Sequence, residues 1–175
     1  MRIRSNKGFT LIELLIVVAI IGIIAAIAVP GLLRARQSGN EASAIGSVRA
    51  INSAQVTYAA SCGGGGYATD LVDLATPPAT PNAQSFISPD LNANGVDKSG
   101  YDFILAEGGN VQEVLPAANT CNGTVSSSTY HVTASPLQIG STGQRSFASN
   151  NSGTIYQAFN GEPIPVDMGG AQILQ

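Results

Sequence analysis

Charged side chains are scarce in this 175-residue chain, which has 8 Lys and Arg, 11 Asp and Glu, and a formal net charge of −3. They make up 11% of the residues, against about 25% in an ordinary soluble domain. Nucleic-acid-binding domains normally show a basic patch or stripe, so this balance argues against one. The chain also has no Trp, one His and two Cys, which leaves little for a metal cluster or a His-based triad. The composition therefore argues against the common enzyme classes, and we expect no catalytic activity and no cofactor.

Apolar residues, in contrast, are concentrated near the N-terminus. Between Phe9 and Leu33 the only charged residue is Glu13. A membrane-spanning helix needs about 20 predominantly apolar residues, so this run is long enough to span a membrane. Basic residues before a span favour a cytoplasmic N-terminus, but here they lie on both sides and do not fix the orientation (Arg2, Arg4 and Lys7 before; Arg34, Arg36 and Arg49 after).

Two ordinary interpretations of the apolar run compete. Ala26-Ile27-Ala28 fits the small-residue site at which a secretory signal peptide is cut, which would release a soluble protein, although such apolar regions usually have 7–15 residues. A plain single-span anchor, carrying a monomeric periplasmic binding domain, explains the length but not Glu13. An acid at mid-span costs on the order of 2.5–3.5 kcal/mol, so even near the end of the span Glu13 requires a partner.

The residues Lys7-Gly8-Phe9-Thr10-Leu11-Ile12-Glu13 resemble the leader junction of type IV pilins and type II secretion pseudopilins. The resemblance implies that a prepilin peptidase cuts between Gly8 and Phe9, and that Phe9 is then N-methylated. Gly22 and Pro30 also match the helix pattern of this family in their spacing from the cut, which implies a role in assembly.

By the same resemblance, Glu13 is an assembly residue that meets the N-terminal amine of a neighbouring subunit. Cleavage after Gly8 creates an ammonium group on Phe9, and methylation keeps its charge. An ammonium and a carboxylate are each costly in a low-dielectric setting and offset one another when paired. A pair within one chain, four residues apart on the helix, is equally consistent with the sequence.

The second half of the N-terminal region predicts an amphipathic helix. Its apolar positions include Ala44, Val48 and Tyr58, whereas Glu41, Ser47, Arg49 and Gln55 are among its polar positions. Pro30 predicts a kink or break, and the helix signals stop at Cys62, before Gly63–Gly66. We therefore expect a leader (1–8), a transmembrane and polymerisation helix (9–33), an amphipathic helix half (34–62) and a β-rich head (63–175).

The head predicts a sheet of about four antiparallel strands laid across the second half of the helix. Asn150-Asn151-Ser152-Gly153 predicts a hairpin turn, and Asp70–Leu74 one helical turn. The predicted class is α+β, with a long N-terminal helix on a small antiparallel sheet, as in the type IV pilin fold. The candidate strands are Tyr101–Glu107, Thr129–Ala134, Arg145–Ser149 and Thr154–Phe159.

Three features of the head bear on possible sites. Cys62 and Cys121 are expected to form a disulfide if the head is exported; otherwise they are free buried thiols, and many pilins bridge the C-terminal part of the head instead. The side chains of Asp90, Asn92, Asn94 and Asp97, with Gly95 at the turn, are a weak calcium candidate. They match the start of an EF-hand loop but lack its closing Glu, and surface turns use the same residues. His131 is expected on the surface of a strand.

The sequence thus predicts a structural subunit of a bacterial type IV pilus. It would be an inner-membrane prepilin with its head in the periplasm, and then part of an extracellular fibre. The implied partners are further copies of itself (with minor pilins as an option), the prepilin peptidase, an assembly ATPase and an inner-membrane platform, and no nucleic acid is expected. A pseudopilin of a type II secretion system, in a periplasmic pseudopilus, is the alternative within the family.

Overall fold

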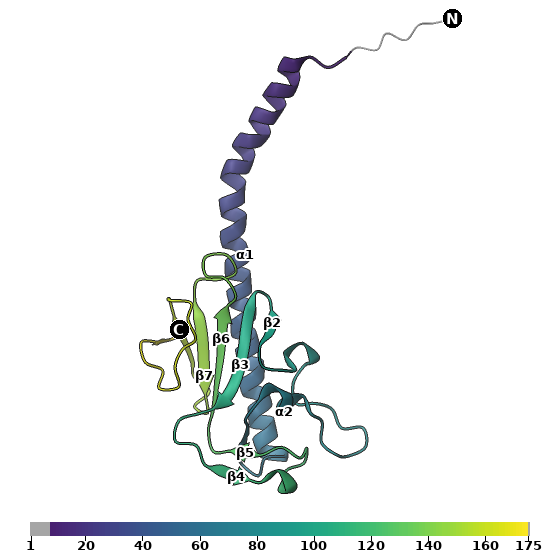
Figure 1. Ribbon diagram of the computed structural model, residues 1–175, viewed down its shortest axis with the longest axis vertical. Coiled ribbons are helices and arrows are strands. Elements are labelled where there is room, and N and C mark those ends of the chain that lie inside the picture. The colour runs from purple at the N-terminus through teal and green to yellow at the C-terminus, as the bar shows by residue number, and fades with distance from the viewer. Residues whose placement is uncertain (1–7, 175) are drawn as a thin grey trace, which may run out of the picture. The chain divides into compact units, whose positions relative to one another are not determined.

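A computed structural model of the protein describes residues 8–174 (Figure 1). It is an α+β structure in which a long N-terminal helix, α1 (Leu11–Ser61), precedes a head built of short antiparallel strands. The chain divides into two compact units, residues 1–36 and 37–175, and each is described separately. The domain boundaries predicted after residues 33 and 62 remain predictions.

The first unit holds the N-terminal part of α1, whose apolar side chains are all exposed. The helix continues through Pro30, so of the two predicted outcomes the break is wrong, and a kink at this residue stays a prediction. A proline in a helix interior removes one backbone hydrogen bond, but the residues on both sides remain helical. At the other end, α1 stops at Ser61, one residue before the predicted limit, and Gly63–Gly66 follow.

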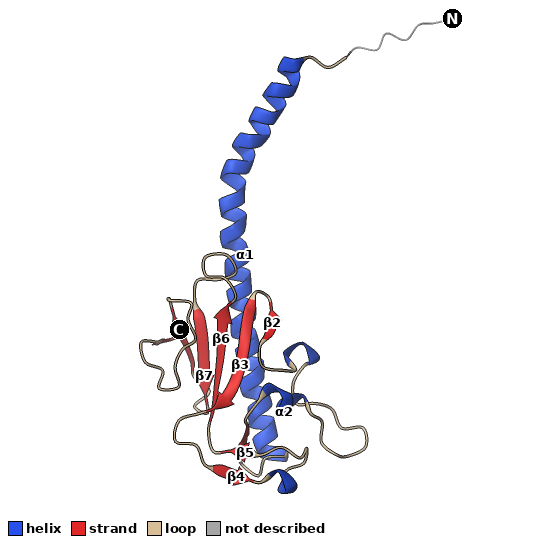
Figure 2. Ribbon diagram, in the orientation of Figure 1, coloured by secondary structure: helices blue, strands red, loops and turns tan. Residues whose placement is uncertain are grey.

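In the second unit, one face of α1 is buried against the sheet (Figure 2). Ala44, Val48, Ile51 and Tyr58 recur at steps of three, four and seven residues, the spacing of a single helix face, and all are fully buried. Three residues assigned to the polar positions are buried as well: Glu41, Ser47 and Gln55. At these three positions the polarity of the residue therefore does not indicate exposure to solvent.

Gln55 shows how a polar side chain is accommodated in this core. Its Nε2 donates to the Ala68 carbonyl and its Oε1 accepts from the Ala68 amide, both at 2.8 Å. Both ends of the side chain are thus satisfied, which removes most of the cost of burying an amide. Gln55 thereby ties α1 to β1 (Tyr67–Ala68).

The main sheet has six antiparallel strands in the order β2-β3-β6-β7-β8-β9, and four of them correspond to the four predicted strands. A second sheet of three strands, in the order β1-β5-β4, was not predicted. A short helix, α2 (Leu71–Ala75), is capped by Asp70 at the predicted helical turn. The strands are β2 (Val96–Lys98), β3 (Tyr101–Glu107), β4 (Glu113–Leu115), β5 (Ser126–Ser127), β6 (Tyr130–Pro136), β7 (Ser146–Asn150), β8 (Ile155–Ala158) and β9 (Gln172–Ile173), with 3₁₀ turns at Pro89–Leu91 and Ala117–Asn119.

Side chains on β6 alternate between the two faces of the main sheet. Tyr130 faces α1, because its hydroxyl donates to Asn52 Oδ1 at 3.1 Å. The next residue, His131, therefore points to the opposite face, yet it is only 6% exposed. The expectation of a surface histidine is wrong. Its Nε2 has no hydrogen-bond partner in the described structure, and burial lowers the pKa of His131.

Both edges of the main sheet are short. The edge strand β2 has three residues, including Asp97 and Lys98, and the other edge strand, β9, has two. The turn from β2 to β3 passes through Ser99 and Gly100, which have φ angles of 53° and 75°. Glycine adopts this left-handed region without strain, which fits a tight hairpin at this point.

Candidate functional site

The predicted cleavage site lies in a non-helical segment. Gly8, Phe9 and Thr10 precede α1 and are exposed, with Phe9 88% exposed. The peptide bond between Gly8 and Phe9 is therefore open to an enzyme acting from outside the chain. The rest of the predicted leader, residues 1–7, lies outside the described residues.

Thr10 and Glu13 form a reciprocal cap at the start of α1. The Glu13 carboxylate accepts from the Thr10 amide at 2.9 Å and from the Thr10 hydroxyl at 2.7 Å. In return, the Glu13 amide donates to Thr10 Oγ1 at 3.3 Å. This is a capping box, in which two otherwise unpaired helix amides are satisfied by side chains. Sequence reasoning missed it, although the signal, Thr followed three residues later by Glu, was present.

The capping box bears on the predicted partner of Glu13. In this structure the Phe9 nitrogen is still a peptide nitrogen joined to Gly8, so the ammonium group that would attract Glu13 does not exist. The carboxylate instead bonds within its own chain, to Thr10. Both bonds end on Oε2, so Oε1 of the same carboxylate stays available to a further donor.

The apolar part of α1 is long and hydrophobic enough to cross a membrane, with a mean hydropathy of 3.1 over its best 18 residues and none of that window buried. Gly22 lies within it. A Cβ added to Gly22 would meet no atom within 4 Å, so the fold of the single chain does not require a glycine there. A glycine inside a helix costs about 1 kcal/mol relative to alanine. This cost has no compensation within the chain.

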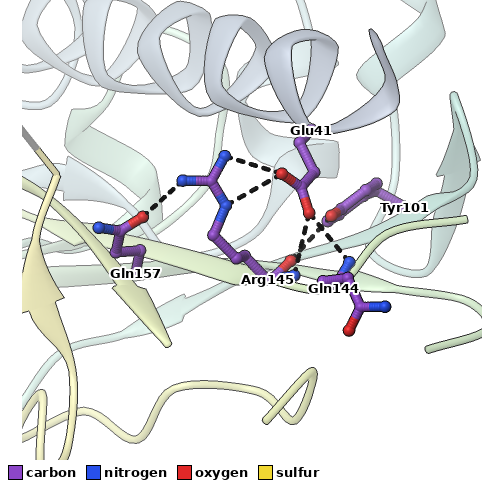
Figure 3. A network of polar contacts seen from close by, with 5 residues as sticks. All are labelled: Glu41, Tyr101, Gln144, Arg145 and Gln157. Carbon is purple, nitrogen blue, oxygen red and sulfur yellow. Dashed lines mark hydrogen bonds and ion pairs between the residues drawn. The ribbon is translucent and has the colours of Figure 1, made fainter. Parts of the chain in front are cut away.

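A partly buried ion pair fixes the second half of α1 to the sheet (Figure 3). Glu41 Oε2 accepts from Arg145 Nη2 at 2.7 Å and from Nε at 2.9 Å, which is a bidentate contact. Its other oxygen accepts from the backbone amides of Gln144, at 2.9 Å, and Arg145, at 3.2 Å. The Tyr101 hydroxyl in turn donates to the Arg145 carbonyl at 2.8 Å. No local pattern in the sequence indicates this network.

The environment of Glu41 favours its charged form. Burial opposes ionisation, but the hydrogen bonds from Gln144 and Arg145 and the charge of the Arg145 guanidinium outweigh it and lower the pKa of Glu41. Arg145 is held from its other side as well, since its Nη1 donates to Gln157 at 2.8 Å and its guanidinium lies 5.5 Å from the centre of the Phe147 ring. The pair therefore joins α1 to both β7 and β8.

The structure contains the predicted disulfide between Cys62 and Cys121, with a Cα–Cα distance of 4.8 Å. This distance is within the usual range for a disulfide. The bond joins the residue after α1 to the segment before β5, across 59 positions of sequence.

The calcium candidates are engaged in contacts within the head. Asp90 forms an ion pair with Lys98 at 2.7 Å. Asn94 donates to Asp70 at 2.8 Å and to the Leu105 carbonyl at 2.7 Å, and it accepts from the Leu105 amide. Among residues 8–174, no three His, Cys, Asp or Glu side chains are placed to hold a metal ion. The weak calcium candidate formed by Asp90, Asn92, Asn94 and Asp97 remains an untested prediction.

Comparison with known families matches residues 3–29 to the prokaryotic N-terminal methylation motif. This match covers the predicted cut, Phe9 and the capping box. The N-terminal segment therefore carries the motif that type IV pilins and type II secretion pseudopilins share. The curated relatives of the chain include proteins of both kinds.

The chain is 47% identical over 53 residues to the type IV major pilin protein PilA of Myxococcus xanthus, which is 30% of this chain and 24% of that protein. It is 63% identical over 38 residues to the type IV wide pilus major component PilA4 of Thermus thermophilus, 22% of this chain and 29% of the relative. It is also 34% identical over 58 residues to the type II secretion system core protein G of Klebsiella michiganensis, 33% of this chain and 41% of the relative.

The pilin-type likeness thus covers less than half of the length of these relatives. No solved structure is significantly similar to the chain. Most of the head therefore has no counterpart in these comparisons.

Proposed function

We propose that the chain is a structural subunit of a bacterial type IV pilus. It is made as a prepilin, cut between Gly8 and Phe9, N-methylated at Phe9 and polymerised through the N-terminal half of α1. The observation that carries this proposal is the methylation motif at residues 3–29. It coincides with the start of a helix whose apolar surface is exposed. The chain carries out no chemistry of its own in this role.

The exposed apolar helix supports polymerisation. Apolar surface is stabilised by about 25 cal/mol for each Å² removed from water, so a helix of this hydropathy requires a membrane or other helices around it. Before assembly the inner membrane covers it, and afterwards copies of the same helix do. A Gly22 that no intrachain contact explains suits close approach between helices.

The partners follow from this role. They are the prepilin peptidase, an assembly ATPase, an inner-membrane platform and further copies of the chain, with minor pilins as additional members of the fibre. The Cys62–Cys121 disulfide supports a head outside the cytoplasm, because disulfides persist in oxidising compartments. We place the head in the periplasm before assembly and on an extracellular fibre afterwards.

A type II secretion pseudopilin is the second candidate, and the 34% identity to a core protein G favours it. Electron microscopy of sheared cells distinguishes the two. A surface fibre that contains this chain supports the pilus, whereas secretion that depends on the chain, without a surface fibre, supports the pseudopilin.

Mass spectrometry of the mature N-terminus tests the proposal directly. We expect a chain that begins with methylated Phe9. A start at Val29 would identify a cleaved secretory signal and overturn the proposal. An intact Met1 would favour a monomeric membrane-anchored binding domain.

Two substitutions of Glu13 separate its capping role from its charge. Glu13→Gln keeps an oxygen that can accept from Thr10, whereas Glu13→Ala removes the Glu13 side-chain half of the capping box and leaves the bond from the amide of residue 13 to Thr10 Oγ1. We expect both variants to be cut after Gly8 and both to give little fibre, because neither offers a carboxylate to the Phe9 amine of a neighbour. Normal fibre yield from Glu13→Gln would show that the pairing of amine and carboxylate is not required.

A further inference from the structure

Three large apolar side chains are exposed on two neighbouring loops of the head, and we call them the loop patch. Leu137 and Ile139 lie in the loop after β6 and Phe159 follows β8, and these side chains are 51%, 51% and 64% exposed. The loops touch, since a Cβ on Gly161 would lie 2.4 Å from Ile139 Cγ1. Residues 137–143 contain no charged side chain. The loop patch is thus an apolar surface without a partner among the described residues; in the second loop, the exposed Glu162 follows Phe159 by three residues.

The loop that carries Leu137 and Ile139 is fixed to the beginning of the helix in the second unit. Gln37 donates through Nε2 to the Gly140 carbonyl, and Asn40 donates to the Thr142 carbonyl at 2.8 Å. The Glu41–Arg145 pair follows within one helical turn. The loop patch is therefore held close to Gln37, at one end of the second unit.

Only a few residues separate the apolar run from Gln37, where the loop patch is held. Gln37 follows Leu33 by four residues, and four residues span at most about 14 Å even when fully extended. The intervening residues include Arg34 and Arg36, which are exposed. Basic side chains next to a span are attracted to anionic lipid headgroups.

We propose that, before assembly, the loop patch rests on the membrane surface, with Ile139 and Phe159 inserted at the level of the lipid headgroups. This inference rests on one part of the proposed function, that residues 9–33 span a membrane. Apolar and aromatic side chains are stable at this depth because lipid replaces water around them. The contact fixes which end of the head faces the membrane.

The absence of Trp from the natural chain makes the proposal directly measurable. The full-length chain carrying Phe159→Trp is reconstituted at low density in vesicles of phosphatidylcholine and phosphatidylglycerol. Lipids with a quencher near the headgroup then report the depth of this single fluorophore. The matched control is Val56→Trp, because Val56 is 63% exposed and lies 19 residues further along α1 than Gln37, about 29 Å.

We expect the emission of Phe159→Trp to shift to shorter wavelength in vesicles and to be quenched by the labelled lipid. Val56→Trp should keep the emission of a water-exposed indole and show little quenching. Adding Leu137→Ser and Ile139→Ser to Phe159→Trp should cause loss of both effects. Circular dichroism and retention of the Cys62–Cys121 bond show that each variant is folded.

Several results would overturn the proposal. Equal quenching of Phe159→Trp and Val56→Trp, whether strong or absent, would show that the loop patch has no preference for lipid. A blue shift that appears only at high protein density would instead identify a second copy of the chain as the occupant. A chain that does not float with vesicles would contradict both this contact and the membrane span, whereas normal quenching without methylated Phe9 in cells would contradict only the proposed pilus function.

Discussion

Replacing Glu41 with glutamine should weaken the attachment of α1 to the sheet. The carboxylate accepts four hydrogen bonds, three of them from Arg145. Glutamine is similar in size and retains one acceptor oxygen, so the change removes the charge without opening a cavity. The Arg145 guanidinium would then lie beside α1 without its counter-charge.

The magnitude follows from burial. Removing one partner of a fully buried ion pair costs 3–5 kcal/mol, as the other charge is left uncompensated. The side chain of Glu41 is only 10% exposed, but that of Arg145 is 28% exposed, so water can solvate part of the orphaned guanidinium. We therefore expect a loss of about 2 kcal/mol in the free energy of unfolding, or a fall of about 6 °C in Tm for a unit of this size.

The assay is thermal unfolding of the full chain in detergent, followed by near-ultraviolet circular dichroism of its tyrosines. Glu107→Gln is the matched control, because Glu107 is exposed at the end of β3 and its change should stay within about 0.5 kcal/mol. A double variant, Glu41→Gln with Arg145→Gln, should lose less than the sum of the two single changes, since the residues act as a pair.

The pH dependence gives an independent check. The pKa of Glu41 is lower in the folded protein than in the unfolded chain. The stability that Glu41 contributes is therefore complete above the pKa of the unfolded chain, about 4.3. This stability is lost as the pH falls through the pKa of Glu41 in the folded protein. The Tm difference between wild type and Glu41→Gln should therefore be constant near neutral pH and should shrink in acid. Equal Tm values near neutral pH, or a difference that persists in strong acid, would refute the role assigned to the charge.

Three further changes test other parts of the head. A Cys62→Ser and Cys121→Ser double variant should lose up to about 4 kcal/mol of unfolding free energy, and a reductant should lower the Tm of wild type but not of this variant. His131 has a lower pKa in the folded protein than in the unfolded chain. Its contribution to the free energy of unfolding is therefore complete above the pKa of the unfolded chain, about 6.5, and is lost as the pH falls toward the pKa in the folded protein. His131→Leu should remove this loss of stability between about pH 7 and pH 5. A calcium titration should leave the Tm unchanged, because Asp90 and Asn94 are engaged within the head, and a rise in Tm would restore the calcium hypothesis.

The elements that the sequence predicted are those with a long, regular pattern. The strand β3 has the predicted bounds, Tyr101–Glu107, because large apolar residues alternate along it and point to one face. The helix α1 was predicted from its apolar run and its later stripe. The strands β1, β5 and β9 have two residues each, too few to show any period, so they were not predictable in this way.

Buried polar residues were missed because their partners are distant in sequence. Glu41 and Arg145 are 104 positions apart, and no local pattern links them. Likewise, Gln55 resembles a solvated helix residue until its two bonds to Ala68 are seen. His131 follows the alternation of β6, but the face it occupies is buried as well, as the buried neighbours Thr133 and Ala148 show.

The candidate site likewise has parts that a local sequence pattern predicts and a part that it does not. The methylation motif is a contiguous run of residues, so the sequence alone pointed to it. The capping box was also readable, because Thr10 and Glu13 are three residues apart. The proposed partner of Glu13 is an amine that does not exist until the Gly8–Phe9 bond is cut, so a structure of the uncut chain contains no geometry for it.

The short edges of the main sheet have a consequence for a chain that is proposed to be packed at very high local concentration. Exposed strand edges are templates on which other chains can add strands and form disordered aggregates. Here β9 offers only two residues, and β2 offers three, with the charged side chains of Asp97 and Lys98 among them. Neighbouring heads therefore have little backbone on which to build a continuous sheet. In the proposed fibre, the contacts that drive growth would then come from the apolar helix.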